Sequence, residues 1–517
     1  MKKIALSISL LLLTAVAATA QTMNVRVGQV TYAYSAANTG DMTITGGNTL
    51  TIEGKAYNTG SISQISIDDS DVADNTVSVS YNGTSASVVV AGNVAQYLTV
   101  SVTGAHVSIV QADDLPSEIT YTLSGTSTDG EFYMDGSLKA SLELDGLSLT
   151  NPSGPAINIQ NGKRISLSVK KDTENTLRDG SGGDWKGCLR CKGHLELKGK
   201  GVLNVYGNTA HAVWSKEYVE MKNCTVNILK AVGDGLNCNQ YFLMESGTLS
   251  ISGVGDDGIQ VSYKTDDDGT VESDEENTGA LTVSGGTLSV TTTAAGAKGL
   301  KAEGAVLVNE NSATTVITVK NSGGVDATDS SDPTSSSCLK SDKAITIDGG
   351  TLTLTNTGQG GRAINSEGTL TISGGTISAQ AQDTFYPGWN LGVQGGANYV
   401  SSNYPDATGW SSPGTKKYSK YYELASGADL SDIFEAIADA ASGSSQNTNV
   451  TSESAVTVDV VSTSFNIPGG AEDISVQIAP CTGSFVYTDG KTYLSFGEAK
   501  EATEYGLPAI DLDEDAL

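Results

Sequence analysis

The sequence predicts an all-β protein whose central part is a right-handed, single-stranded parallel β-helix, flanked by strand-rich N- and C-terminal regions. Three observations carry this prediction. Short segments alternate between apolar and polar residues, glycine-rich turns separate them, and one strand motif returns at a fixed spacing. A period of about 20 to 50 residues is typical of stacked repeats.

The first residues have the layout of a cleavable secretory signal. Lys2 and Lys3 precede an apolar run over 4–16 and the small residues Ala18-Thr19-Ala20. No cysteine follows the expected cleavage point, and no later stretch reaches the ~20 apolar residues of a spanning helix. We therefore expect a soluble, exported protein that is secreted, periplasmic or held at the cell surface.

The chain is strongly acidic. It carries 59 acidic and 30 basic residues, a net charge of −29, which becomes −31 once the two signal lysines are removed. Such a charge repels phosphate backbones and anionic lipid surfaces, so we expect neither nucleic acid nor membrane as a partner.

The repeat is most regular in the middle of the chain. Leu203, Val226 and Leu249 occupy equivalent places in three similar strands, two successive steps of 23 residues. A second, offset series includes Asp234-Gly235-Leu236 and Asp257-Gly258-Ile259, so two short strands are expected in each step. A leucine-rich repeat would carry a helical arm, and a β-sandwich would lack the fixed period. Stacked parallel coils with inward Leu, Ile and Val are therefore predicted.

Two insertions interrupt the period. The first, 262–278, is acidic and is expected to be an exposed loop; its Asp266-Asp267-Asp268-Gly269 run only loosely resembles a calcium-binding loop. The second, 325–337, is rich in Ser and Asp and is expected to be a flexible excursion.

Aromatic residues concentrate after the last repeat. Tyr386, Trp389 and Trp410 belong to this group, and they could form a platform for sugar rings or cover the open end of the coil. Leu430, Ile433 and Ile437 then have helical spacing. The expected organisation is a signal peptide at 1–20, an N-terminal β-rich region at 21–111, the β-helix at 112–382, an aromatic-rich cap or loop at 383–428, a short helix at 429–442 and a C-terminal β-rich region at 443–517.

Six cysteines follow the signal segment. An even number in an oxidising compartment permits disulfides, whose pairing the sequence leaves open. The Cys188-x-x-Cys191 pair has no second copy, and the chain has three histidines, so small buried residues stacked inside a coil are favoured over a zinc site.

Two aspartate motifs are the main candidate for chemistry. Gly233-Asp234-Gly235 and Asp256-Asp257-Gly258 lie one 23-residue step apart, so stacking would bring their carboxylates to neighbouring rungs. Like charges this close require a cation, and calcium prefers such oxygen ligands. We predict a calcium site formed by Asp234, Asp256 and Asp257, with Asn208 of the preceding step as a neutral ligand. Asp-Gly is also a common turn pair, so both motifs could serve only as turns.

These motifs, together with 144–150, 154–157 and 174–180, resemble a known family over about residues 112–382. It is the right-handed parallel β-helix family of carbohydrate-binding domain proteins, the cellulose- and polygalacturonate-binding type. The resemblance implies calcium bound on the coils and recognition of acidic plant polysaccharide, with cellulose as a further ligand of relatives. This sequence departs from a stronger acidic site because Asn208 and His211 precede Asp234.

The coil architecture is also similar to that of family 9 polysaccharide lyases. There, calcium-binding acids lie near a lysine that abstracts the proton α to a uronate carboxylate, and Lys298 or Lys301 could take that role here. The expected function is non-catalytic, calcium-assisted binding of acidic polysaccharide. A calcium-dependent pectate-type lyase and a surface adhesin or scaffold are the alternatives. No Ser/His/Asp constellation or phosphate loop supports a hydrolase or a nucleotide-binding protein.

Overall fold

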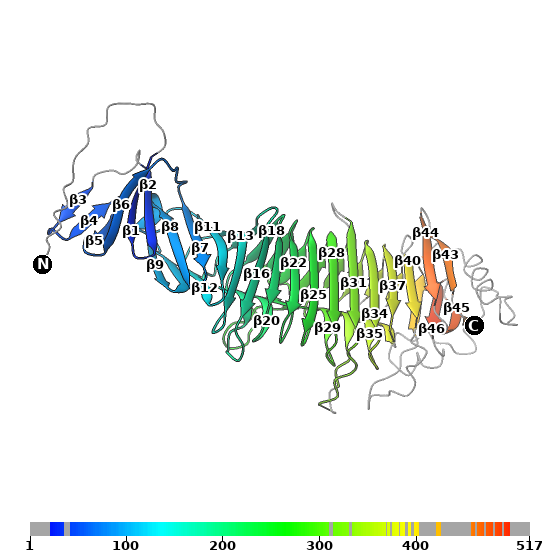
Figure 1. The fold of residues 1–517 in the computed structure, drawn as a ribbon. Helices are drawn as coiled ribbons and strands as arrows, with labels where there is room; N and C mark the ends of the chain where they lie inside the picture. Colours follow the sequence, from blue (N-terminus) through cyan, green and yellow to red (C-terminus); the bar gives the residue numbers. More distant parts are fainter. Residues whose placement is uncertain are drawn as a thin grey trace.

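The protein is an elongated stack of β-strands, seen in a computed structural model (Figure 1). The structure describes residues 21–35, 42–309, 314–329 and 333–368, and from 370 to 496 the strands and a few residues beside them, with 403–419 and 425–455 as the longest gaps. Strand hydrogen bonding continues from the N-terminal strands through the coils to the C-terminal strands. The described part contains no helix long and apolar enough to span a membrane.

The N-terminal strands pair mainly as antiparallel neighbours. β1 pairs with β2 and β6, β7 with β8, and β9 with β10 in antiparallel fashion, whereas β2 pairs with β8 and β7 with β11 in parallel. The elements are β1 (Thr22–Val27), β2 (Val30–Ser35), β3 (Thr43–Thr45), β4 (Thr49–Ile52), β5 (Lys55–Asn58), β6 (Ile62–Asp68), β7 (Thr76–Asn82), β8 (Ser85–Ala91), α1 (Gly92–Ala95), β9 (Leu98–Thr103) and β11 (Ile119–Ser127).

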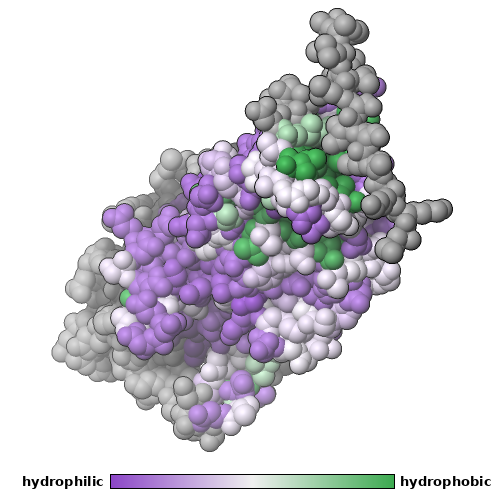
Figure 2. All heavy atoms as spheres, turned by 90° about the vertical axis from the view of Figure 1, so that its left-hand side faces the viewer, coloured by the Kyte–Doolittle hydropathy of each residue, from purple (hydrophilic) through white to green (hydrophobic). Residues whose placement is uncertain are grey.

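This end of the molecule presents a largely hydrophilic surface interrupted by hydrophobic residues (Figure 2). Exposed apolar side chains of the N-terminal strands include Ile44 of β3 and Ile65 and Ile67 of β6. Single exposed apolar residues are usual on a soluble protein and need no special explanation.

Each coil of the central stack contains three strands, which form three parallel tracks. The first track belongs to the twelve-stranded sheet: β10 (Ala105–Gln111), β12 (Gly130–Asp135), β14 (Ile157–Ile159), β17 (Gly187–Cys191), β20 (His211–Ser215), β23 (Leu236–Asn239), β26 (Ile259–Ser262), β29 (Lys298–Ala302), β32 (Ser337–Ser341), β35 (Arg362–Ser366) and β38 (Asp383–Pro387).

The second and third tracks belong to the larger sheet. The second holds the first half of β13 (Ala140–Asn151), then β15 (Ile165–Val169), β18 (Leu195–Gly199), β21 (Val219–Lys222), β24 (Tyr241–Met244), β27 (Ala280–Val283), β30 (Val306–Val308), β33 (Ile345–Ile347), β36 (Leu370–Ile372) and β39 (Leu391–Val393).

The third track holds the second half of β13, then β16 (Glu174–Asp179), β19 (Val202–Tyr206), β22 (Thr225–Lys230), β25 (Thr248–Val254), β28 (Gly286–Thr292), β31 (Thr315–Asn321), β34 (Thr351–Asn356), β37 (Thr376–Gln380) and β40 (Asn398–Ser402). Beyond the coils lie β41 (Lys420–Leu424), β42 (Val456–Val460), β43 (Thr463–Gly469), β44 (Glu472–Ile478), β45 (Cys481–Thr488) and β46 (Lys491–Phe496), which pair mostly as antiparallel neighbours.

The core is a set of apolar ladders inside the coil. Leu203 of β19 pairs with Val226 of β22, and Val226 with Leu249 of β25, and all three are fully buried. The same ladder continues through Leu288 and Ile317. Because every inward position stacks on its equivalent one rung away, the 23-residue period becomes a continuous hydrophobic column.

The Gly-Thr motif at the start of these strands has a steric cause. Gly247 has φ 97°, and a Cβ atom there would lie 2.4 Å from the carbonyl oxygen of Cys224 on the neighbouring coil. Glycine is the residue that tolerates this left-handed conformation and this close approach. The motif therefore marks the corner at which the chain turns into the third track.

The predicted fold class is confirmed, because parallel strands stack coil upon coil through crossovers of a kind that is right-handed in nearly all proteins. The expectation of two strands in each step is wrong. The missing strand lies in the second track, where only three to five residues alternate before the corner glycine.

Five cysteines are free and buried inside the coils, Cys188, Cys191, Cys224, Cys238 and Cys338. The helix predicted at 429–442 lies outside the described residues.

We expect truncation of one ladder residue to loosen the stack measurably. Leu249→Ala should lower the free energy of unfolding by about 2–5 kcal/mol, because the rigid neighbouring rungs cannot close the cavity. Urea-induced unfolding followed by circular dichroism measures this change. Ser250→Ala, on the outward side of the same strand, should change it by less than about 0.5 kcal/mol. Equal effects of the two substitutions would contradict the inward assignment of Leu249.

Candidate functional site

Three carboxylates meet at the entrance to two neighbouring strands of the twelve-stranded sheet. Asp234 precedes β23, and Asp256 and Asp257 precede β26, with Leu236 of β23 paired to Ile259 of β26. One carboxylate oxygen of each aspartate lies within 4.8 Å of those of the other two. Asp234 and Asp257 are buried, at 2% and 1% exposure, whereas Asp256 is exposed. We call these three residues the aspartate cluster.

Backbone hydrogen bonds from one rung to the next fix the cluster. The N–H of Asp257 donates to Oδ1 of Asp234 over 3.0 Å, and the N–H of Lys298 donates to Oδ1 of Asp257 over 2.6 Å. On the other side, the N–H of Asp234 donates to Nδ1 of His211 over 3.1 Å. Each side chain in this series thus accepts the backbone N–H of the following coil, so the coil spacing sets the separation of the carboxylates.

Packing between neighbouring coils explains why glycine follows the aspartate here. A Cβ atom on Gly258 would lie 2.4 Å from the carbonyl oxygen of Gly299 and 2.3 Å from the Val290 side chain. A larger residue would push neighbouring coils apart just where the aspartates stack. The glycine therefore permits the close turn, and the aspartate beside it faces the cluster.

Burial and mutual repulsion disfavour ionisation of the cluster. Burial raises the pKa of Asp234 to about 7, and the charges of Asp257 and Asp256 act in the same direction. The Nδ2 of Asn237 donates to Oδ2 of Asp234 over 2.8 Å and opposes this rise. Burial, followed by the charge of Asp257, also raises the pKa of Asp256. Asp234 and Asp256 therefore hold a proton more tightly than free aspartates do.

His211 borders the cluster as a neutral ring. Burial and the charge of Lys186 lower the pKa of His211 to about 4. Its Nδ1 accepts the backbone N–H of Asp234, which assigns the ring proton to Nε2. The 3.3 Å contact between Nδ1 and Oδ2 of Asp234 is accordingly no ion pair at neutral pH.

Two lysines flank the cluster, and their environments differ. The Nζ of Lys301 lies 3.2 Å from Oδ2 of Asp257. Burial disfavours its charge, but the charge of Asp257 and this bond prevail and raise the pKa of Lys301. Lys298 is 8% exposed, and burial lowers its pKa although Asp257 and Asp256 act against that shift. Lys301 therefore keeps its proton, and Lys298 gives its proton up more readily.

The structure brings together three of the four predicted metal ligands and engages the fourth elsewhere. Asn208 donates its Nδ2 to the carbonyl of Asp179 over 2.8 Å, and its Oδ1 accepts a bond from Lys230 over 2.8 Å. The residue on the rung before Asp234 is His211. The step from Asn208 to Asp234 is 26 residues, so Asn208 falls out of register with the aspartates.

Trp389 and Trp410 lie outside the described residues. Tyr386 is described as part of strand β38, where its backbone pairs with Asn365.

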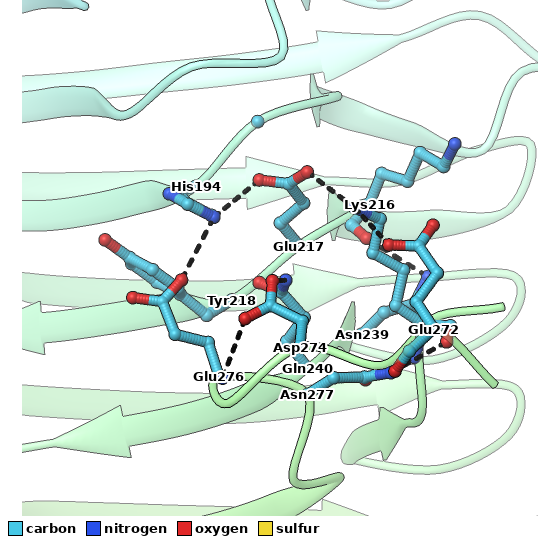
Figure 3. Close-up of polar contacts among 12 residues, drawn as sticks. His194, Lys216, Glu217, Tyr218, Asn239, Gln240, Glu272, Asp274, Glu276 and Asn277 are labelled. Atoms are coloured by element: carbon cyan, nitrogen blue, oxygen red, sulfur yellow. Dashed lines mark hydrogen bonds and ion pairs between the residues drawn. The ribbon is translucent and has the colours of Figure 1, made fainter. Parts of the chain in front are cut away.

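The first acidic insertion is anchored to the coils (Figure 3). Lys264 lies 2.9 Å from Glu217 and 2.8 Å from Glu272, while His194 lies 2.6 Å from Glu217 and 3.5 Å from Glu276. The expectation of a wholly exposed loop is thus wrong for its base, since Lys264 and His194 compensate its carboxylates. The segment 265–271 is exposed or nearly so.

Tyr218 extends this anchor as part of a stack of rings. Its ring lies 4.1 Å from that of His194 and 4.5 Å from that of Tyr241, nearly parallel to both. Sequence reasoning missed these ring contacts because the partners are 23 and 24 residues apart and share no motif. Within the described residues, the aspartate cluster is the one group of three or more His, Cys, Asp or Glu side chains with ligand atoms this close together.

The fold and the cluster define a parallel β-helix protein with a carboxylate site on one sheet. A family model for carbohydrate-binding domain-containing proteins matches residues 103–384, more than half of the chain. The chain belongs to this family, and carbohydrate is its class of ligand.

One solved structure is similar to the chain. It is that of a polysaccharide lyase-like protein from C. thermocellum, a gadolinium derivative, with 19% identity over 57% of this chain and 96% of the other, and a TM-score of 0.39. The comparison with curated proteins found no match.

The protonation of Asp234 should be visible in the stability of the metal-free protein. Because its folded pKa of about 7 exceeds the unfolded value of about 3.9, this contribution is fully present below pH 4 and is lost as pH rises through 7. Urea unfolding in chelator should show a decline between about pH 4 and 7 that is smaller in Asp234→Asn than in the wild type, with Asp234 contributing no more than about 4 kcal/mol. Asp267→Asn, in the exposed insertion, should retain the wild-type profile, and an unchanged profile in Asp234→Asn would contradict the assignment.

Proposed function

We propose that the protein binds acidic polysaccharide and that Asp234, Asp256 and Asp257 hold a calcium ion for this purpose. The observation that supports the proposal best is the convergence of three carboxylates, two of them buried, on one sheet. Buried like charges are costly unless a cation or protons compensate them.

The chemistry of the donor set fits calcium. Calcium takes six to eight oxygen ligands in flexible mixtures of carboxylate, carbonyl and water, and the cluster supplies carboxylates from two rungs. Asp256 is exposed, so the cluster is open to a ligand from outside. Such a bound ion supplies positive charge and free coordination positions for a uronate carboxylate.

Cations beside the cluster support an acidic ligand. Lys301 keeps its proton next to Asp257. The charges of Asp257 and Asp256 also favour the charged form of Lys298, whereas burial and the charge of Lys301 disfavour it. A protein of net charge −29 would otherwise repel a polyanion, so local positive charge is needed for contact. Polygalacturonate is the ligand we propose on this basis.

We also propose that the protein is exported by a cleaved signal peptide at 1–20, and that it acts in the periplasm, at the cell surface or outside the cell. The layout of Lys2, Lys3 and the apolar run supports this location. Weak calcium sites are useful in extracellular modules, where affinities of about 10⁻⁴ to 10⁻³ M are common.

Removal of one buried carboxylate should weaken the binding of calcium and of polysaccharide together. Asp257→Asn is expected to weaken calcium binding by at least about tenfold, since even outer-shell substitutions at metal sites cost this much. Calorimetric titration with calcium measures the first effect, and retention on a polygalacturonate gel with calcium or with chelator measures the second.

The matched control is Asp267→Asn, which removes an equal charge from the exposed insertion and should leave both bindings unchanged. Retention that survives chelation would contradict calcium-assisted binding. A protein that binds no calcium stoichiometrically would instead support the adhesin or scaffold alternative.

A calcium-dependent lyase is the second candidate, and the environment of Lys298 favours it over the scaffold. Burial lowers the pKa of Lys298, so its neutral amine can accept a proton more readily than that of Lys301. In β-elimination the amine takes the proton α to the uronate carboxylate, the electron pair forms the new carbon–carbon double bond, and the bond to the leaving glycosidic oxygen breaks.

If the protein is a lyase, incubation with polygalacturonate and calcium should release unsaturated uronides that absorb ultraviolet light. Lys298→Gln should then reduce the rate by about 10² to 10⁴, the contribution typical of a positioned base. Lys320→Gln, an exposed lysine on β31, is the control. Absence of unsaturated products from calcium-loaded wild-type protein would remove this candidate.

A further inference from the structure

One row of outward side chains runs along the twelve-stranded sheet and passes the aspartate cluster. Backbone pairing places one member on each successive rung, about 4.8 Å from the next. All members are partly exposed. We call this row the outer ladder, and its members are Asn158, Arg190, Trp214, Asn237, Gln260 and Lys301.

Two members in the second half of the outer ladder contact the cluster directly. Asn237 donates its Nδ2 to Oδ2 of Asp234 over 2.8 Å, and Lys301 contacts Asp257 at 3.2 Å. Lys301 also donates to Oε1 of Gln260 over 3.4 Å. A ligand held at the cluster therefore lies beside the ladder, and Trp214 stands on the rung next to Asn237.

Arg190 and Trp214 form a cation–aromatic pair in which one hydrogen-bond donor of Arg190 has no acceptor among the described residues. The guanidinium carbon of Arg190 lies 5.7 Å from the centre of the Trp214 ring, and the buried Nε of Arg190 has no hydrogen-bond partner among the described residues. Because this Nε is buried, a ligand from outside meets the guanidinium through its other N–H donors, and Arg190 as a whole is partly exposed. A planar guanidinium is suited to a carboxylate.

A second Arg–aromatic pair on the other sheet shows a different arrangement. Arg178 of β16 covers the ring of Tyr206 of β19, with its guanidinium carbon 3.3 Å from the ring centre. That guanidinium stacks on the tyrosine face. Arg190 stands farther from the indole, so the Trp214 ring is less closely covered by its own chain.

We infer that Arg190 and Trp214 form a uronate-binding subsite next to the aspartate cluster. The Trp214 ring stacks against the apolar face of one sugar ring, and the Arg190 guanidinium binds the carboxylate of the next residue. The rung spacing of about 4.8 Å is close to the length of one pyranose residue, so an acidic chain held at the cluster can follow the ladder from rung to rung. The inference rests on the proposed binding of acidic polysaccharide and assigns where the chain extends from the cluster.

The test uses the mature full-length protein and oligogalacturonates of increasing length, titrated by calorimetry in calcium. Affinity should rise as the chain grows long enough to reach Trp214 and then Arg190. Trp214→Ala should lower the affinity for the longer oligogalacturonates about tenfold, the size expected for one aromatic contact. It should leave the calcium affinity measured without sugar unchanged. Trp214→Phe should recover part of the loss because it restores a ring.

The role of Arg190 is tested by ligand length. Arg190→Gln should weaken binding of an oligogalacturonate long enough to reach Arg190 and leave binding of a shorter one, which reaches only the cluster, unchanged. Tyr206→Ala, at the other Arg–aromatic pair, is the matched control and should bind both ligands as the wild type does.

The outcomes separate the two proposals. Wild-type affinity of Trp214→Ala and Arg190→Gln at every length would overturn the subsite and leave the proposed function standing. Binding of oligogalacturonate that is indifferent to Asp257→Asn, yet lost in Trp214→Ala, would overturn the calcium-assisted function and keep the contact surface. No binding by the wild type would overturn both.

Discussion

Backbone hydrogen bonding between successive coils is the interaction on which the rest of the structure depends. Parallel pairing fixes equivalent residues about 4.8 Å apart, rung after rung, across three tracks. A residue type that recurs in the sequence at the coil period therefore becomes a continuous column. Inside the coil this produces the ladder through Leu203, Val226 and Leu249, and outside it produces rows of polar side chains.

The same spacing makes a candidate binding site out of the Asp-Gly motif. A single Asp-Gly pair is a common turn, but two in register bring carboxylates to neighbouring rungs, where the backbone N–H groups of Asp257 and Lys298 fix them. The stack buries Asp234 and Asp257 and leaves Asp256 exposed. Burial and the charges of Asp257 and Asp256 raise the pKa of Asp234, and a bound cation would offset the repulsion between these charges.

Insertions show how the coil tolerates departures from its period. The acidic insertion leaves the stack after β26 and returns at β27, which pairs with β24 as the uninterrupted chain would. Lys264 neutralises carboxylates of both the insertion and the coil, so an unfavourable charge density is confined to the exposed segment. The twelve-stranded sheet stays regular beside it, which keeps the outer ladder continuous across this coil.

The sequence by itself determined the fold class, the inward apolar positions and the meeting of Asp234, Asp256 and Asp257, because a repeat period and a parallel coil leave one register in which equivalent residues stack. It did not determine the second track, whose short strands carry too few alternating residues to be recognised, or the displacement of Asn208 toward Asp179 and Lys230. Only the tertiary structure decided the different protonation of Lys298 and Lys301, the anchoring of the insertion and the row through Arg190 and Trp214. These depend on burial and on contacts between residues far apart in the chain, and local sequence patterns encode neither.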